Sequence, residues 1–190
     1  MSASKWKPYP SYKDSDTFAK KIPAHWKELA LKRVSSINDD TLPEDTAPMR
    51  EMCYVDIGSV SYEEGITECE KMVFEKSPSR ARRLANDGDV IVSTVRTYLK
   101  AICKIENLSD EMVFSTGFAI VRPDNSWNKD SIGDFIVGEY FVENVVANSD
   151  GVSYPAINAS DLACLKIIQP PKKEQALIKE FLKGKISKIN

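Results

Sequence analysis

The sequence predicts an α+β protein: a globular domain with a twisted mixed β-sheet and short helices, followed by a C-terminal helix of coiled-coil type. The best strand is Val90–Val95, a run of β-branched residues that follows the turn signal Asn86-Asp-Gly-Asp89. The helix is indicated by apolar residues at steps of four, four and three: Ile178, Leu182, Ile186 and Ile189. We therefore expect a domain over residues 1–170, with an N-terminal arm over residues 1–21, and a helix over residues 171–190.

Shorter strand signals occupy much of the domain. Residues 26–34 are interpreted as a short strand or a turn, and Cys53–Gly58 as a strand closed by glycine. Further strands are expected over residues 99–105, 113–121 and 162–168.

The segments between these strands differ in character. Ile132–Ala147 carries apolar residues at mixed spacing, which favours a helix, although its β-branched residues also suit a strand. Ser77–Arg83 is a basic loop or a short helix. Asn148–Ser160 is polar and contains glycine and proline, so we expect a loop there.

The composition excludes several classes of protein. Of the 190 residues, 42% are hydrophobic and 28% are charged, which is typical of a packed domain and not of a disordered chain. No stretch approaches the roughly 20 apolar residues of a membrane span, and the start of the chain lacks the apolar core of a secretion signal. We therefore expect a cytoplasmic protein whose four cysteines are reduced thiols, with Cys103 and Cys164 in apolar surroundings.

The net charge of -2 conceals a segregated distribution of charge. Residues 1–37 carry a balance of +5 and residues 38–70 carry -9, after which residues 71–104 carry +5 and residues 105–161 carry -8. A protein that binds nucleic acid needs a local basic surface and not a basic average. The pattern therefore permits a nucleic-acid partner, while ordinary solvated faces remain the alternative.

Motifs that would indicate catalysis are absent. The sequence contains neither a phosphate-binding loop nor a dinucleotide-binding glycine pattern, and the cysteines form no C-x-x-C pair that would suggest zinc. His25 is the one histidine, so a histidine-based catalytic pair would have to use it, and a structural or surface role is the better interpretation. We expect no complete active site on this chain.

Three stretches, taken in order, resemble one known family. The first is Tyr12-Lys-Asp-Ser15 followed by Ile22-Pro-Ala-His-Trp26 and Leu31-Lys-Arg-Val34. It is similar to the opening of that family, where an arm leads through an I-P-x-x-W element into a recognition domain. The second is Ser79–Leu84 followed by Gly88-Asp-Val-Ile-Val-Ser-Thr-Val-Arg-Thr-Tyr-Leu-Lys100, which is similar to the core strand of the family.

The third stretch combines Gly151-Val-Ser-Tyr-Pro-Ala-Ile-Asn158 with Pro170-Pro-Lys-Lys-Glu-Gln175. It resembles the closing element of the family, in which P-P-x-x-E-Q opens a long helix. On these three stretches the chain resembles the DNA-specificity subunit of type I restriction-modification systems, in its N-terminal half.

This resemblance implies a function without catalysis. Members bind double-stranded DNA through two target-recognition domains, each reading one half of a split sequence, and two long helices set the spacing. Modification subunits dock on this frame and methylate adenine, and restriction subunits add translocation and cleavage. We expect no cofactor or metal on this chain, because S-adenosylmethionine, ATP and magnesium would belong to the partner subunits.

The length departs from the family pattern, because the sequence shows one recognition domain and part of one helix. The chain is expected to be either a piece of a longer subunit or a natural half-subunit that forms a homodimer. The interface would use the residues of the apolar stripe: Ile178, Leu182, Ile186 and Ile189. Packing of the stripe against its own domain is the alternative.

The resemblance and the basic block together name candidate DNA contacts. Three arginines are candidates for phosphate or guanine contacts, and the end of the core strand is expected to contact the DNA backbone or to be structural. The full set is Lys71, Lys76, Ser77, Ser79, Arg80, Arg82, Arg83, Arg96, Thr97, Tyr98 and Lys100. The competing hypothesis is a scaffold module that binds a protein through its terminal helix and does not bind DNA.

Overall fold

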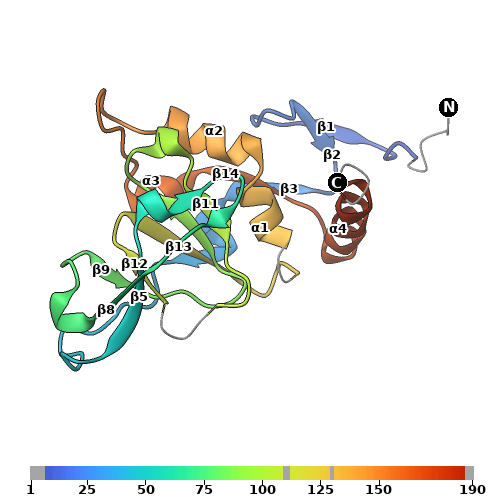
Figure 1. Ribbon diagram of the computed structural model, residues 1–190. Helices are drawn as coiled ribbons and strands as arrows, with labels where there is room; N and C mark the ends of the chain where they lie inside the picture. Colours follow the sequence, from blue (N-terminus) through green and yellow to red (C-terminus); the bar gives the residue numbers. More distant parts are fainter. Residues whose placement is uncertain (1–6, 109–111, 129–130, 187–190) are drawn as a thin grey trace.

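The computed structural model describes residues 7–108, 112–128 and 131–186 and confirms the predicted α+β class. Within these ranges the strands form several small sheets, accompanied by four α-helices. A four-stranded sheet lies in the middle of the molecule, a second one lies at one end, and the N-terminal hairpin and α4 (Lys172–Ile186) lie at the other end (Figure 1).

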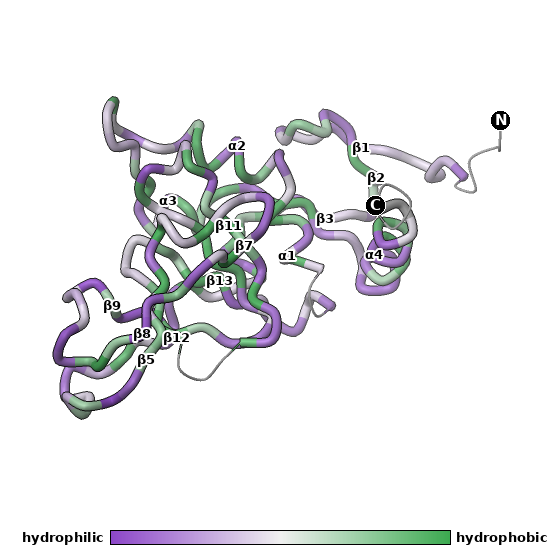
Figure 2. Tube along the Cα trace, in the orientation of Figure 1, coloured by the Kyte–Doolittle hydropathy of each residue, from purple (hydrophilic) through white to green (hydrophobic). Residues whose placement is uncertain are grey.

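The central sheet is antiparallel, with the strand order β11-β10-β13-β4. Its strands are β4 (Ser35–Ile37), β10 (Val90–Ser93), β11 (Ile102–Lys104) and β13 (Phe118–Pro123). The strand predicted from its β-branched residues is thus confirmed as β10, which is paired on both sides. Because side chains alternate along a strand, Val90 and Val92 enter one core cluster and Ile91 enters another. All three are 0% exposed. Figure 2 colours the chain by hydropathy and shows hydrophobic segments in the middle of the molecule, around β13.

The second sheet is mixed. Its order is β8-β5-β12-β9, and the pair of β5 with β12 is parallel while the outer pairs are antiparallel. The strands are β5 (Glu51–Val55), β8 (Glu70–Val73), β9 (Ala81–Arg83) and β12 (Met112–Ser115). Strand β9 corrects the interpretation of residues 81–83 as part of a loop or a short helix, because its backbone pairs with the edge of β12, whereas residues 77–80 lie in a turn.

Helices cover the central sheet on the side of the first core cluster. The helix predicted over residues 132–147 is divided into α1 (Ser131–Ile136) and α2 (Glu139–Ala147), with an extended Gly138 between them. Residues 162–168 were predicted as strand, but α3 (Ala159–Cys164) occupies the first half because Asn158 caps it, accepting a hydrogen bond from the Asp161 amide. The strand there is β14 (Lys166–Gln169).

The remaining elements are short, and one of them departs from the prediction. The strand predicted over residues 99–105 is limited to β11, because a 3₁₀ turn, η4 (Thr97–Leu99), precedes it. Smaller strands complete the fold: β1 (Tyr12–Asp14) with β2 (Lys21–Pro23), β3 (Lys27–Ala30) with β14, and β6 (Val60–Ser61) with β7 (Gly65–Ile66).

The cysteines differ from the prediction of reduced thiols. Cys53 and Cys69 form a disulfide, because the antiparallel pairing of β5 with β8 brings their Cα atoms within 5.4 Å. Cys103 is a buried free thiol, and burial raises its pKa to about 11. Cys164 is free but exposed, so the expectation that it lies in apolar surroundings is wrong.

Glu174 joins the N-terminal arm to α4. Its carboxylate accepts hydrogen bonds from the Tyr9 hydroxyl at 2.9 Å and the Trp26 indole at 2.9 Å, and His25 Nε2 lies 2.5 Å from its other oxygen. Burial alone would raise the pKa of Glu174, but the hydrogen bonds from Trp26, His25 and Tyr9 together lower it. The I-P-x-x-W and P-P-x-x-E-Q stretches therefore meet in one cluster.

Gln175, the next residue, fixes the start of α4 to the domain. It is 3% exposed, and its side-chain oxygen accepts from the Asn128 amide at 2.8 Å while its side-chain nitrogen donates to the Pro170 carbonyl at 2.8 Å. The pair Glu174-Gln175 thus attaches α4 to the arm on one side and to the domain on the other.

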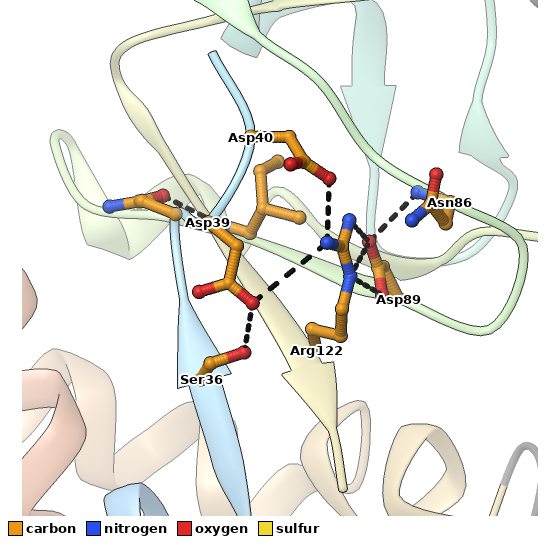
Figure 3. Close-up of polar contacts among 8 residues, drawn as sticks. Ser36, Asp39, Asp40, Asn86, Asp89 and Arg122 are labelled. Carbon is orange, nitrogen blue, oxygen red and sulfur yellow. Dashed lines mark hydrogen bonds and ion pairs between the residues drawn. The ribbon is translucent and has the colours of Figure 1, made fainter.

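A buried ion pair connects the strands of the central sheet with the loop after β4. Arg122 donates to Asp89 through Nη2 at 2.8 Å and through Nε at 3.1 Å, and to Asp40 at 2.6 Å (Figure 3). The Asp89 side chain is 3% exposed and also accepts from the Asn86 amide at 2.8 Å. Figure 3 shows the guanidinium of Arg122 lying between these carboxylates, which satisfy its donors.

Replacement of Asp89 by alanine is expected to lower the free energy of unfolding by about 3 kcal/mol or more, because it leaves the guanidinium of Arg122 partly buried without its main partner. Urea denaturation measures this change. Asp45→Ala, at an exposed position in the loop after β4, is the control and should have an effect near zero. Equal effects of the two substitutions would show that the ion pair contributes nothing specific.

The Glu174 cluster predicts a pH dependence. A carboxylate whose pKa is lowered by folding contributes stability above its unfolded value, near 4.5, and loses that contribution as the pH falls through the folded pKa. Glu174→Gln should therefore destabilise the protein at pH 7, and the difference from the wild type should shrink on acidification below pH 4.5. Urea titrations of both proteins from pH 7 to pH 3 measure it, and a constant difference would contradict the prediction.

Candidate nucleic-acid interface

The arginines of β9 and of the turn before it do not form one exposed cluster. Arg80 donates through Nε to the Tyr54 hydroxyl at 2.9 Å and through Nη2 to Asp56 at 2.7 Å. The hydrogen bond to Tyr54 and the Asp56 carboxylate raise the pKa of Arg80. Its side chain is still 56% exposed, but part of its charge is balanced within the protein.

The other two arginines are engaged by the domain. The guanidinium of Arg82 lies 5.0 Å from the centre of the Phe74 ring and donates to the Ala81 carbonyl. The Nε of Arg83 is buried and has no hydrogen-bond partner within the described ranges, and burial lowers the pKa of Arg83. Both side chains therefore make contacts within the domain, which limits how far they can contact an external ligand.

The remaining candidates near β9 are separate from one another. Lys71 on β8 and Lys76 at the end of the following 3₁₀ turn are exposed. Ser77 donates to the Phe74 carbonyl at 2.8 Å and thereby caps that turn, whereas Ser79 is exposed. Their roles in DNA binding stay predictions.

The turn between β10 and β11 is held in an unusual conformation. Arg96 and Lys100, which flank η4, have φ values of 50° and 52° and so lie in the left-handed region that non-glycine residues seldom adopt. Thr97 anchors the turn, because it is 2% exposed and its hydroxyl lies 2.8 Å from that of Ser149. Lys100 forms an ion pair with Glu143 at 2.5 Å.

The loop over residues 148–158 packs beside this turn. Val95 and Ala156 form an antiparallel bridge, and the Ile157 amide donates to the Thr94 carbonyl at 2.9 Å. The guanidinium of Arg96 lies 5.4 Å from the centre of the Tyr154 ring. Two segments that are about 60 residues apart in sequence thus form one surface, at the end of the molecule away from α4 (Figure 1).

This surface, which we call the η4 surface, exposes large apolar and aromatic side chains. Tyr98 is 51% exposed, Tyr154 is 68% exposed and Val152 is fully exposed. The complete set is Val95, Arg96, Tyr98, Leu99, Val152 and Tyr154. Of the predicted contacts it contains Arg96 and Tyr98, whereas Thr97 is buried beneath it. Sequence reasoning missed Val152 and Tyr154, which it interpreted as part of a closing element.

The predicted helix interface is only partly described. Ile178 is half-buried and Leu182 is 40% exposed, and both line a pocket between α4, α1 and the arm. Ile186 ends α4, but its side chain lies outside the described residues, as does all of Ile189. On α4, Leu177 and Phe181 are 50% and 41% exposed, so apolar surface also lies outside the predicted stripe.

Neither a metal site nor a membrane-spanning helix is found among the described residues. Among the described residues, no group of three or more histidines, cysteines and carboxylates could hold a metal ion. No helix in that part of the chain is long and apolar enough to cross a membrane.

Comparison with known proteins identifies similar structures, although neither a protein-family model nor a curated protein matches the sequence. The HsdS subunit from Thermoanaerobacter tengcongensis superimposes with a TM-score of 0.76 at 26% identity, covering 92% of this chain and 45% of its own. A second structure comes from work on complex assembly and conformational transition of the type I R-M system. It superimposes with a TM-score of 0.76 at 25% identity, and the match covers 88% of this chain and 44% of the other.

A more distant likeness supports the fold alone. The type I restriction-modification S subunit from M. genitalium has a TM-score of 0.53 at 14% identity over 84% of this chain. This chain spans less than half the length of the first two structures. Over the part that it spans, the chain has the fold of the specificity subunits of type I restriction-modification systems, and the resemblance predicted from its three sequence stretches is confirmed.

Proposed function

We propose that this chain is a specificity subunit, or part of one, that binds double-stranded DNA sequence-specifically and recognises one half of a bipartite target. It directs adenine methylation and restriction, which partner subunits carry out. The observation that carries this proposal is the agreement in fold and sequence with specificity subunits over 88% and 92% of the chain. Its partners are modification subunits and, where present, restriction subunits, and its DNA target implies a cytoplasmic location.

The chemistry belongs to the partners in this proposal. S-adenosylmethionine, ATP and magnesium bind to the other subunits, and this chain contributes recognition and positioning. The division into a recognition domain over residues 1–170 and a spacer helix from residue 171 is part of the same proposal. It is supported by the attachment of α4 through Glu174 and Gln175 at its first turn.

The η4 surface is the best candidate for contact with DNA. Arg96 supplies a cation that can reach a phosphate or a guanine edge, and Tyr98 and Tyr154 supply hydroxyls for phosphate and rings for sugar or base contacts. The left-handed residues on each side of η4 hold Arg96 and Tyr98 on a fixed turn, which lowers the entropy lost on binding. By contrast, the charge of Arg80 is partly balanced by Asp56.

Substitution of Arg96 tests this assignment. Arg96→Ala should weaken binding to a pool of random double-stranded DNA by about tenfold, because one phosphate or base contact is lost. The slope of log Kd against the logarithm of the salt concentration should fall by about one. Tyr154→Ala should also weaken binding. Fluorescence anisotropy with labelled duplexes between low and high salt measures both quantities.

Two control variants make the result specific. Arg33→Ala removes an exposed arginine from another element and should leave the affinity nearly unchanged. Arg80→Ala tests the competing surface. If Arg80→Ala loses affinity and Arg96→Ala does not, the DNA interface lies beside β9 and not at the η4 surface. Loss in neither, with DNA still bound, would exclude both surfaces.

A scaffold module that does not bind DNA is the second candidate. The exposure of Leu177 and Phe181 on α4 favours it, because exposed apolar side chains on one helix are suited to helix packing. The exposed Leu177 and Phe181 are also the basis for proposing a homodimer through α4. If low-salt anisotropy detects no DNA binding while purified modification subunits bind the chain, the scaffold function is correct and DNA recognition is not.

A further inference from the structure

The disulfide of Cys53 with Cys69 closes a loop at the end of the molecule that carries the second sheet (Figure 1). The two cysteines are 16 positions apart in sequence, and a 3₁₀ turn, η2 (Ile57–Ser59), lies between them with β6 and β7. Cys53 lies on β5, which is hydrogen-bonded to β8 on one side and to β12 on the other, whereas Cys69 precedes β8. The hydrogen bonds of the sheet therefore do not depend on a bond between the two sulfur atoms.

One of the two cysteines can be reached from solvent. Cys53 is 5% exposed, but Cys69 is half-buried and lines a surface cavity of about 510 Å³. A thiol attacks a disulfide at a sulfur atom that it can reach, so the attack is directed to Cys69, and Cys53 is the leaving group. Reduction of this disulfide therefore does not require the domain to unfold.

The same cavity contains the partners of Arg80. Tyr54, Asp56 and Arg80 line it together with Cys69. Tyr54 and Asp56 follow Cys53 within three positions, and they accept hydrogen bonds from Arg80 at 2.9 Å and 2.7 Å. Because closing a loop restricts its conformations, the disulfide limits the motion of the segment that holds the guanidinium of Arg80.

The cellular location bears on the role of this disulfide. The proposed function implies the cytoplasm, and the inference rests on the proposed function in this one respect. Cytoplasmic thiols keep most cysteines reduced, so a disulfide in that compartment is typically transient and responds to redox conditions. A disulfide that a reductant can reach, and on which the hydrogen bonds of the sheet do not depend, fits this class better than the structural class.

We propose that Cys53 and Cys69 form a reversible thiol–disulfide switch that sets how firmly Tyr54 and Asp56 hold Arg80. In the oxidised state the guanidinium is paired within the protein. In the reduced state the segment over residues 53–69 loosens, and the cation becomes free to pair with an external anion. The switch deepens the proposed function, because it regulates one of the candidate DNA contacts.

The reductant is a dithiol. One thiolate of the dithiol attacks Sγ of Cys69, the bond between the two protein sulfur atoms breaks, and Cys53 leaves as a thiolate. The second thiol of the dithiol then displaces Cys69 from the mixed disulfide, so the dithiol forms its own disulfide and two electrons pass to the protein. The two cysteines take up the two protons that the dithiol gives up. Oxidised glutathione reverses the reaction and leaves as two thiols.

The first measurement counts thiols after reduction of the folded protein. The full chain is treated with dithiothreitol in native buffer, acidified to stop exchange, then unfolded and alkylated with N-ethylmaleimide. Mass spectrometry should find two alkylated cysteines before reduction and all four after it. Treatment of the reduced protein with oxidised glutathione should restore the count of two.

The second measurement follows Arg80 in the ¹⁵N-labelled chain. Its Nε–H resonance, identified by its loss in Arg80→Lys, should exchange with water about tenfold faster after reduction, because the hydrogen bond to Tyr54 opens more often. Cys69→Ser should show the fast rate with and without dithiothreitol. Cys164→Ser, which removes an exposed free thiol, is the control and should respond as the wild type does.

Three results would overturn the proposal. The first is a thiol count that stays at two unless urea is added, because the disulfide would then be inaccessible in the folded protein. The second is an exchange rate of Arg80 that reduction does not change. The third is a reduced protein that is unfolded at room temperature, because the disulfide would then be structural.

A reduced protein that stays folded supports the proposal. Its Tm should be lower by roughly 6–12 °C, as expected when a loop of this length is opened in a domain of this size. Neither measurement uses DNA. A chain that fails to bind DNA would therefore refute the proposed function and leave the switch standing.

Discussion

The ion pair of Arg122 with Asp89 is the interaction on which the arrangement of the two sheets depends. Asp89 stands at the entrance to β10, and Arg122 lies on β13, the neighbour of β10 in the central sheet. The same guanidinium holds Asp40, whose carbonyl accepts from the Leu84 amide just after β9 of the second sheet. Because Asp89 is almost completely buried, removal of Arg122 would leave a buried carboxylate without its cation, whereas removal of Asp89 would leave the guanidinium paired with Asp40 but without its main partner. One polar cluster therefore connects the sheets.

The central sheet separates two surfaces that the proposed function uses differently. The η4 surface begins at the end of β10, where the turn around η4 contacts the loop over residues 148–158. Thr97 hydrogen-bonds to Ser149, and Val95 forms a β-bridge with Ala156. At the other end, Glu174 and Gln175 attach α4 to the arm and the domain. The central sheet lies between these two ends of the molecule (Figure 1).

The candidate DNA contacts illustrate how far sequence reasoning reached. Basic residues at positions 80, 82 and 83 were recognisable, but their availability depends on Tyr54, Asp56 and Phe74, which lie on other elements. Tyr154 could not be assigned from its own neighbours, because only the packing of its loop against Arg96 gives it a role. The roles of Glu174 and Gln175 were likewise hidden, since their partners Tyr9, Trp26 and Asn128 are distant in sequence.

The sequence by itself determined the α+β class, the central strand β10, the helix α4 and the resemblance to specificity subunits, because these follow from local patterns of side chains. Only the tertiary structure decided the division of the helix at Gly138, the strand β9, the disulfide of Cys53 with Cys69 and the composition of the η4 surface. The strand, the disulfide and the η4 surface depend on contacts between segments far apart in the chain. A local pattern contains the propensity of a segment but not the identity of its neighbours, and the neighbours determine which charges remain available to a ligand.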